Sequence, residues 1–252
     1  ISAGSDAGSS SDPARIDATN LGPGTYVLLA MEEDGKYVGD YGLSLQFIKA
    51  SCAVPIGCTE DLSANLSTKA EIDAYTFELT DASTFVIARM QQDGSSIYSY
   101  LELYKVGSTI SAGSDAGSSS DPARIDATNL GPGTYVLLAM EEDGKYVGNY
   151  GLSLQFIKAS CAIPIGCSED LSANLTKKAE IDAYTFEIAD SSTFVIARMI
   201  QDGSSIYSRL ELYKVGSTAA VGSDAGSFSD PARIDVVNLV PGTYVLLAME
   251  ED

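Results

Sequence analysis

The chain repeats itself with a fixed period of 109 residues. The segment Ile-Ser-Ala-Gly-Ser-Asp at 1–6 returns at 110–115, and an altered form returns around 222–224. The first two periods differ at ten of 109 positions, and the third stops after 34 residues, on Met-Glu-Glu-Asp. A fixed period indicates an array of similar units, and arrays more often form scaffolds, filaments or binding surfaces than a single catalytic pocket.

Both ends of the sequence fall inside a repeat, because residues 248–252 match 30–34, which continue directly into Gly35. We therefore expect the 252 residues to be one stretch of a longer array. The period divides the stretch into three parts. These are the C-terminal part of a preceding repeat (1–50), one complete repeat (51–159) and a second repeat that lacks its last strand (160–252).

The chain is strongly acidic, with 35 Asp and Glu against 15 Lys and Arg and a formal charge of −20. One period, 51–159, carries 14 acidic and 6 basic residues, so successive copies repel one another. This charge argues against nucleic acid and anionic membrane surfaces as partners. The hydrophobic content of 45% is ample for a packed core, and no apolar run approaches the 18 residues of a membrane span.

Each repeat carries one Cys-x5-Cys segment, Cys52 with Cys58 and Cys161 with Cys167, around a Pro-Ile-Gly sequence. We interpret each segment as a local disulfide loop closed by the bend at Pro-Ile-Gly, which implies an extracytoplasmic protein. So short a loop contributes roughly 2 to 2.5 kcal/mol and stiffens the chain locally. Two free buried thiols are the alternative, and a metal site is disfavoured because the chain has no His.

One period is a series of short strands separated by turns. Turn sequences occur at 93–94, 113–121, 131–133 and 143–144, and no segment shows a convincing helical period. The predicted strands are 70–79, 84–90, 100–106, 123–128, 134–140 and 150–156. Short strands at this spacing predict an all-β fold, with antiparallel β-sandwiches of about 100 residues.

The strand 26–31, repeated at 135–140 and 244–249, is apolar on both faces. It is either central and covered by loops, or packed against a neighbouring domain; it is also our candidate contact surface between chains. Position 100 differs between copies, Tyr100 against Arg209, and we expect it to be exposed and tolerant. The link between copies has no Gly/Ser spacer, which favours a rod or superhelix that advances roughly 35–45 Å per repeat if domains stack end to end.

The order of motifs in one repeat resembles the bacterial pre-peptidase C-terminal domain family, over roughly residues 60–158. The motifs are Asp73-Ala-Tyr-Thr-Phe77, Tyr100-Leu-Glu-Leu-Tyr104, Asp121-Pro-Ala-Arg-Ile125, Leu130-Gly-Pro-Gly-Thr-Tyr135 and Gly148-Asn-Tyr-Gly-Leu152. The resemblance implies tandem jelly-roll-like sandwiches of a secreted protein, related to the collagen-binding domains of bacterial collagenases. These motifs are framework residues, so they bear on the fold more than on the function.

The sequence offers little catalytic chemistry. Without His there is no Ser-His or Cys-His nucleophile, and without Trp a glycosidase cleft has little support. We therefore predict no catalytic residue and no enzymatic activity.

Two kinds of modification or ligand site are candidates. The Asp/Ser/Gly loops suit calcium, the one possible cofactor, although any solvated turn has the same composition; the aspartates are Asp6, Asp12, Asp115, Asp121, Asp224 and Asp230. Asn65 and Asn174 each stand in an Asn-x-Ser/Thr sequence and are candidate glycosylation sites.

Three functions are compatible with these features. The favoured one is a structural protein of an extracellular fibre, stalk or cell-surface assembly that self-associates into a polymer or filament. The second is an adhesin or binding array in which each repeat binds a polysaccharide, collagen-like or other protein ligand, through multivalency. The third is the accessory region of a secreted hydrolase.

Overall fold

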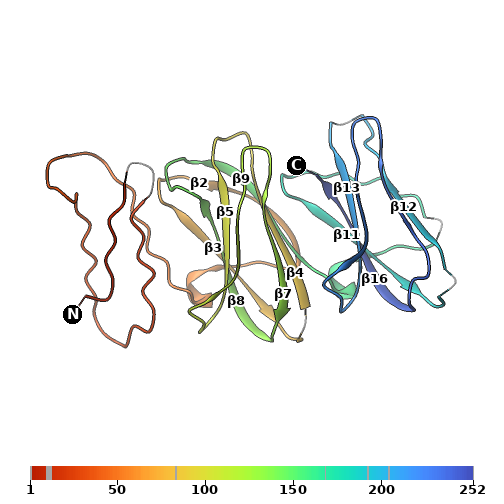
Figure 1. Cartoon of the computed structure of the whole chain (residues 1–252), viewed down its shortest axis with the longest axis horizontal. Coiled ribbons are helices and arrows are strands. Elements are labelled where there is room, and N and C mark those ends of the chain that lie inside the picture. The colour runs from red at the N-terminus through yellow and green to blue at the C-terminus, as the bar shows by residue number, and fades with distance from the viewer. Residues whose placement is uncertain are drawn as a thin grey trace.

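The computed structural model describes residues 2–9, 13–82, 84–167, 169–191, 193–203 and 205–251. It contains two β-sandwiches, preceded by an N-terminal segment in which the described residues form no strand before Val54. Figure 1 shows these three parts following one another along the longest axis of the molecule. No helix among the described residues is long and apolar enough to cross a membrane.

The first sandwich consists of a five-stranded sheet, in the order β1-β3-β8-β5-β6, and a four-stranded sheet, in the order β2-β9-β4-β7. All neighbouring strands are antiparallel except β1 and β3. The elements are the 3-10 turn η1 (Ala50–Cys52), β1 (Val54–Pro55), β2 (Thr59–Leu66), β3 (Ile72–Leu79), β4 (Thr84–Gln92), β5 (Ser99–Lys105), β6 (Ser111–Ala116), β7 (Ala123–Leu130), β8 (Gly133–Glu141) and β9 (Gly148–Phe156).

The second sandwich repeats this plan with a five-stranded sheet, β10-β11-β16-β13-β14, and a two-stranded sheet, β12-β15. The turn η2 (Ala159–Cys161) joins it to the first sandwich. Its strands are β10 (Ile163–Pro164), β11 (Ile181–Ile188), β12 (Val195–Met199), β13 (Ser208–Lys214), β14 (Ala220–Ala225), β15 (Ala232–Val236) and β16 (Gly242–Glu250).

The core of the first sandwich is formed by every second side chain of its strands, because successive side chains of a strand point to opposite faces of the sheet. The inward side chains of β9, which are Tyr150, Leu152, Leu154 and Phe156, are at most 6% exposed. The hydroxyl groups of Tyr75 and Tyr150 lie 2.8 Å apart, and Tyr150 also donates to Asp73. The motif aromatics are therefore framework residues, and the prediction of an all-β fold with tandem sandwiches is confirmed.

Three strands of the first sandwich were not predicted, the two-residue β1 and the longer β2 and β6. Strand β6 lies where the composition of 113–121 indicated a loop, and β2 carries mostly small and polar residues. Strand β6 is an edge strand that pairs with β5, and a Cβ added at Gly113 would stand 2.8 Å from Ile125 Cγ2. Small residues are thus needed where the edges of the two sheets approach. Because β6 therefore lacks large apolar residues, the alternation of apolar and polar residues that indicates a strand is absent from its sequence.

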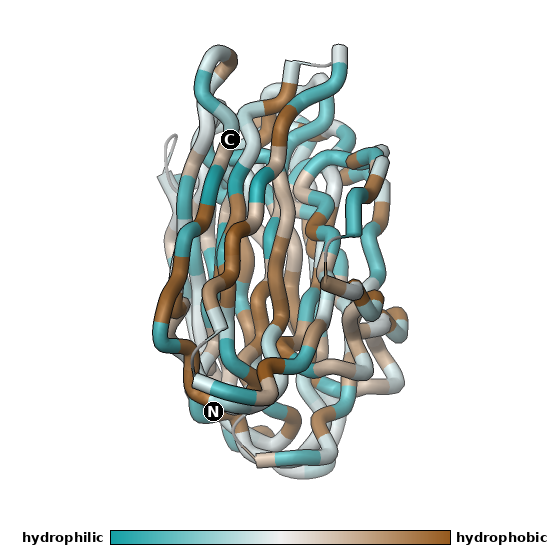
Figure 2. The backbone as a smooth tube through the Cα atoms, turned by 90° about the vertical axis from the view of Figure 1, so that its right-hand side faces the viewer, coloured by the Kyte–Doolittle hydropathy of each residue, from teal (hydrophilic) through white to brown (hydrophobic). Residues whose placement is uncertain are grey.

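Successive sandwiches stack face to face. On the outer face of β16, Val245, Leu247 and Met249 are buried in one cluster with residues of the first sandwich, Phe85, Ile87 and Ile157. Of the two alternatives for the doubly apolar strand, packing against a neighbouring domain is therefore confirmed for 244–249. Stacking end to end is wrong, because the long direction of the strands lies across the stack in Figure 1 and the sheet faces make the joint. Figure 2 views the stack along its axis.

We predict an axial advance of about 20 Å per repeat. Packed sheets lie about 10 Å apart, and each repeat adds two such spacings, one between the two sheets of its sandwich and one between neighbouring sandwiches. Cryo-electron microscopy of arrays of these repeats should show this spacing in averaged images. A spacing near 35–45 Å would contradict face-to-face stacking.

Candidate functional site: the joint between repeats

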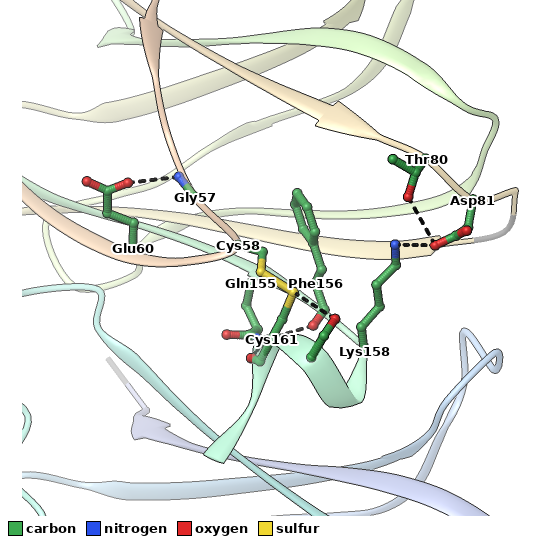
Figure 3. Close-up of a disulfide and its surroundings, with 10 residues drawn as sticks. Gly57, Cys58, Glu60, Thr80, Asp81, Gln155, Phe156, Lys158 and Cys161 are labelled. Carbon is green, nitrogen blue, oxygen red and sulfur yellow. Dashed lines mark hydrogen bonds and ion pairs between the residues drawn. A yellow bond between two sulfur atoms is a disulfide. The ribbon is translucent and has the colours of Figure 1, made fainter. Parts of the chain in front are cut away.

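A disulfide joins Cys58 to Cys161, with Cα atoms 5.8 Å apart, and spans 103 residues of sequence. The predicted pairs Cys52–Cys58 and Cys161–Cys167 are therefore wrong. Cys52 and Cys167 are free and exposed. Figure 3 shows the disulfide beside η2, at the end of the first sandwich from which the chain continues into the second.

The strand order explains this pairing. Cys58 directly precedes β2 and Cys161 follows β9, and these strands are antiparallel neighbours with Thr59 opposite Gln155. The segment between Cys52 and Cys58 does not fold back on itself, because β1 runs extended alongside β3. The Pro-Ile-Gly sequence thus serves as an extended connection, and the cross-link closes a whole sandwich.

Polar contacts fix the turn that presents Cys161. The Gln155 side-chain amide donates to the carbonyl oxygens of Phe156, at 2.7 Å, and Cys161, at 2.8 Å, and is buried. Lys158 Nζ lies 2.6 Å from a carboxylate oxygen of Asp81 (Figure 3). Cys161 is therefore held in position by Gln155 at the end of β9 and by the ion pair of Lys158 with Asp81, which follows β3.

We predict that replacing both Cys58 and Cys161 by Ser lowers the free energy of unfolding of the first sandwich by about 4 to 5 kcal/mol, the value for a closed loop of about 100 residues. Denaturant unfolding measures the loss, and Cys52→Ser is the matched control. Mass spectrometry of non-reduced peptides should find Cys58 linked to Cys161. Peptides that link Cys52 to Cys58 would contradict the structure.

A buried carboxylate accepts hydrogen bonds from several side chains at the joint between the two sandwiches. Both oxygens of Glu211 on β13 accept hydrogen bonds from Arg124 on β7, at 2.9 and 2.7 Å. The hydroxyl of Tyr213 donates to Glu211 at 2.8 Å, as does Arg209 Nε. Bidentate guanidinium–carboxylate pairs are the strong and geometrically specific kind of ion pair.

The charge state of Glu211 follows from these contacts. Burial alone would raise the pKa of the Glu211 carboxyl, but hydrogen bonds and charge attraction, chiefly from Arg124, lower the pKa to about 2. Burial works against the charge of Arg124, yet the pKa of its guanidinium is raised by Glu211 and Asp126. The pair is therefore ionised throughout the physiological range.

The same pair recurs at the joint between the N-terminal segment and the first sandwich. Arg15 lies 2.6 Å from Glu102, and these residues are one period upstream of Arg124 and Glu211. Tyr100 also donates to Glu102, at 3.2 Å. At the second joint Arg209, the counterpart of Tyr100, binds both oxygens of Glu251. The expectation that position 100 is exposed is therefore wrong, because Tyr100 and Arg209 are half-buried and each binds the carboxylate at its joint. That the position tolerates different residues is not contradicted, since the two copies carry Tyr and Arg there.

Glycines allow the backbones of neighbouring units to touch. A Cβ added at Gly151 would stand 1.9 Å from the Lys178 carbonyl oxygen, and one added at Gly42 would stand 2.1 Å from the Lys69 carbonyl oxygen. The two glycines are equivalent positions in successive repeats. Both joints therefore share the close approach of the backbone as well as the ion pair.

We predict that Gly151→Ala weakens the joint by about 1 to 3 kcal/mol, because the added methyl group meets backbone that cannot move without separating the units. Thermal unfolding should show the second sandwich melting earlier. Gly131→Ala is the control, since beyond the chain neighbours of Gly131 the atom nearest to the added methyl group is Nζ of Lys105, at 3.6 Å. Equal effects of the two substitutions would contradict this role of Gly151.

The depressed pKa of Glu211 predicts acid sensitivity of the joint. The ordinary pKa of a glutamate carboxyl is 4.5 and that of folded Glu211 is about 2, so the contribution of the ion pair to stability is complete above about pH 4.5 and is lost as the pH falls towards 2. The shift corresponds to roughly 3 kcal/mol. Denaturant unfolding of the second sandwich should lose stability across this window, and Glu211→Gln should flatten the dependence. An unchanged pH profile in this variant would contradict the assignment.

A cavity of about 480 Å³ opens at the joint beside this ion pair. Its lining includes Arg89, Asp121, Arg124, Arg209, Glu211 and Glu251. The Arg89 side chain is buried, and its Nε and Nη1 atoms have no hydrogen-bond partner among the described residues. Burial and then Arg124 lower the pKa of Arg89 to about 10, so it stays charged at neutral pH.

The aspartates proposed for calcium have other contacts. Asp6, Asp115 and Asp224 each accept a hydrogen bond from the backbone N–H of an arginine nine residues on, at 2.7 to 2.8 Å. The carboxylate of Asp115 thus connects β6 in one sheet to β7 in the other.

The remaining loop aspartates do not gather into a metal site. Asp121 bonds with Ser118, Asp230 bonds with Ser227, and Asp12 lies outside the described residues. The described residues contain no group of three or more acidic, Cys or His side chains that could hold a metal ion. Calcium binding stays a prediction that this geometry does not favour.

The glycosylation candidates are accessible. Asn65 is exposed on β2, where its Nδ2 donates to Asn149 Oδ1 at 2.7 Å, and Asn174 is exposed in the second unit. Their glycosylation stays a prediction.

Comparison with known proteins adds weak similarities. No family model matches the chain, and no curated protein matches it. A pre-peptidase C-terminal domain of collagenase from Bacillus anthracis aligns over 41% of this chain and 94% of that one, at 21% identity and a TM-score of 0.36. The PBSX exported protein XepA aligns over 74% and 84%, at 8% identity and a TM-score of 0.30. At such scores the similarities support no argument about function.

Proposed function

We propose that this chain is a structural tandem-repeat protein of an extracellular fibre, stalk or surface assembly, in which sandwiches stack face to face into a stiff rod. The recurrence of one joint carries the proposal: Arg15–Glu102 and Gly42 at the first joint correspond to Arg124–Glu211 and Gly151 at the second. A joint that repeats with the sequence period can propagate along any number of repeats.

The chemistry of the joint supports stiffness. It combines apolar burial of Leu247 and Phe85, a bidentate ion pair and close backbone contact, so relative rotation of the units would break all three. Domains joined by a flexible spacer would move freely, whereas a large apolar interface holds them in one arrangement. The disulfide that closes the first sandwich supports an extracellular location, since such bonds persist in oxidising compartments.

The surface charge supports separate, soluble rods. The apolar outer face of β16, our candidate for contacts between chains, is buried by the preceding unit of the same chain. What remains outside is strongly acidic, with a net charge of −20, so lateral association needs bound cations or contacts elsewhere.

Small-angle X-ray scattering of the 252-residue chain tests the proposal. A stiff stack should give a rod-like profile, and Leu247→Asp, which places a charge in the buried face of the joint, should give a flexible profile with a larger maximum dimension. Val240→Asp is the control because Val240 is 60% exposed. A flexible profile for the unaltered chain would reject the stiff rod.

The binding array is a second candidate because of the cavity at the joint. The Nε and Nη1 donors of buried Arg89, which have no partner in the described part of the chain, are suited to a carboxylate or sulfate group of an acidic ligand. The net charge of the chain works against a polyanion, which ranks this function second. A glycan array probed with the chain and with Arg89→Ala tests it: signals that the substitution removes would favour binding over a purely structural role. The accessory role for a hydrolase stays a prediction.

A further inference from the structure

The side chain of Arg89 is buried and charged at the joint between the two sandwiches. Arg89 stands on β4 and is 2% exposed, and its Nε and Nη1 atoms have no hydrogen-bond partner among the described residues. Burial lowers the pKa of the guanidinium only to about 10, so the group is charged at neutral pH. A buried charge without an acceptor is strongly destabilising, and native structures seldom contain one. The described residues thus do not supply the acceptor that Arg89 requires.

The two cross-strand neighbours of Arg89 do not act as this acceptor. On β7 the residue opposite is Arg124, and like charges directly opposite each other are destabilising. On β9 the residue opposite is Ser153, whose hydroxyl bonds with Asp61. The charge of Arg124 is compensated by its two hydrogen bonds to Glu211. An additional anionic group beside Arg89 would compensate its charge and weaken the repulsion between the two guanidinium groups.

Arg89 lines the cavity of about 480 Å³ at this joint, and the cavity has walls from both units. The wall from the second sandwich includes Arg209 on β13 and Ser223 on β14. The volume lies in the range of sites for small molecules. A ligand that occupies the cavity would therefore contact the first and the second sandwich at once.

The acidic side chains of the lining have partners of their own. The cavity is lined by three arginines and four acidic residues. Each acidic residue accepts a hydrogen bond from another described side chain, in the pairs Glu211–Arg124, Glu251–Arg209, Asp126–Arg124 and Asp121–Ser118. These carboxylates and the net charge of −20 repel an extended polyanion, whereas a small ion can approach the guanidinium of Arg89 alone. The lining thus favours a small anion.

The cavity belongs to the joint and not to the hairpin that follows the last strand of a sheet. In the first sandwich the hairpin after β8 contacts Ala70 and Tyr98. The counterparts of these two residues, Ala179 and Tyr207, are not among the described residues that line the cavity. A hairpin that follows β16 in the same way would leave the cavity open.

We propose that a small oxyanion of the sulfate or phosphate class binds to Arg89 in this cavity and links the two sandwiches. The oxygens of the ion accept hydrogen bonds from the guanidinium, and Ser223 in the opposite wall offers a hydroxyl donor. Because the ion contacts both units, its binding stabilises the joint. This inference rests on the proposed structural function and deepens it by naming a ligand that regulates the stiffness of the rod.

Isothermal titration calorimetry with sodium sulfate, in chloride buffer at constant ionic strength, tests the site on the 252-residue chain. Sulfate should bind the unaltered chain, and Arg89→Met should weaken the binding at least about tenfold. The substitution removes no side-chain hydrogen bond among the described residues, so the stack should persist. Arg198→Met is the matched control, because Arg198 is the exposed counterpart of Arg89 one period on. Arg89→Lys, which keeps the charge, should weaken the binding less than Arg89→Met.

Two calorimetric results would overturn the proposal. One is the absence of sulfate binding to the unaltered chain, which would mean that water alone solvates Arg89. The other is equal affinity for sulfate in the Arg89→Met and Arg198→Met variants.

Thermal unfolding tests whether the ion stabilises the joint. Sulfate should raise the melting temperature of the second sandwich more in the unaltered chain than in Arg89→Met, because its general effect on protein surfaces is common to both. Equal increases would contradict a link between the units. Scattering in chloride alone reports the stiffness of the chain without the ion, so the rod can survive when sulfate does not bind.

Dextran sulfate distinguishes a free ion from the sulfate group of an acidic polysaccharide. The proposal expects dextran sulfate to bind no more tightly, per sulfate group, than the free ion, because the carboxylates of the lining repel a polyanion. Tighter binding that Arg89→Met removes would assign the site to an acidic polysaccharide and overturn the free ion as its ligand.

Discussion

The burial of both faces of the five-stranded sheet is the constraint on which the rest of the structure depends. In a single sandwich one sheet face meets the core and the other meets water. Here Val245, Leu247 and Met249 point away from the core of their own sandwich and pack on Phe85 and its neighbours in the preceding one. A single repeat would expose this apolar row, so each repeat needs the one before it, as in other repeat architectures.

The pairing of Cys58 with Cys161 follows from the arrangement of the strands in a sandwich. Because β2 and β9 are neighbours, the first and last strands of a sandwich meet, and Cys58 and Cys161 lie where the chain enters and leaves it. The disulfide therefore ties the entry of one unit to the entry of the next. A local loop between Cys52 and Cys58 would have stiffened seven residues, whereas this bond holds β9 in the sandwich that it completes.

The sequence predicted the fold class, six of the strand regions and a contact role for the doubly apolar strand, because alternation and turn residues are local signals. It did not predict β6, whose small residues are required by close approach at Gly113. The disulfide was misassigned because proximity in sequence is a poor guide when extended strands return to the same place. The partnership of Arg124 with Glu211, like that of Arg15 with Glu102, joins residues 87 apart, and no local pattern in the sequence marks such distant residues as partners.

Differences between the near-identical copies concern the joints as well as the exposed surface. Two of the ten differences, Thr68 to Lys177 and Tyr100 to Arg209, replace neutral side chains by basic ones at the second joint. Lys177 donates to the Asp61 carbonyl of the first sandwich, and Arg209 binds Glu251. Lys177 therefore adds a contact between the units, whereas both carboxylate partners of Arg209, Glu211 and Glu251, belong to its own unit. The strength of individual joints can thus vary along the array while the stacking geometry stays constant.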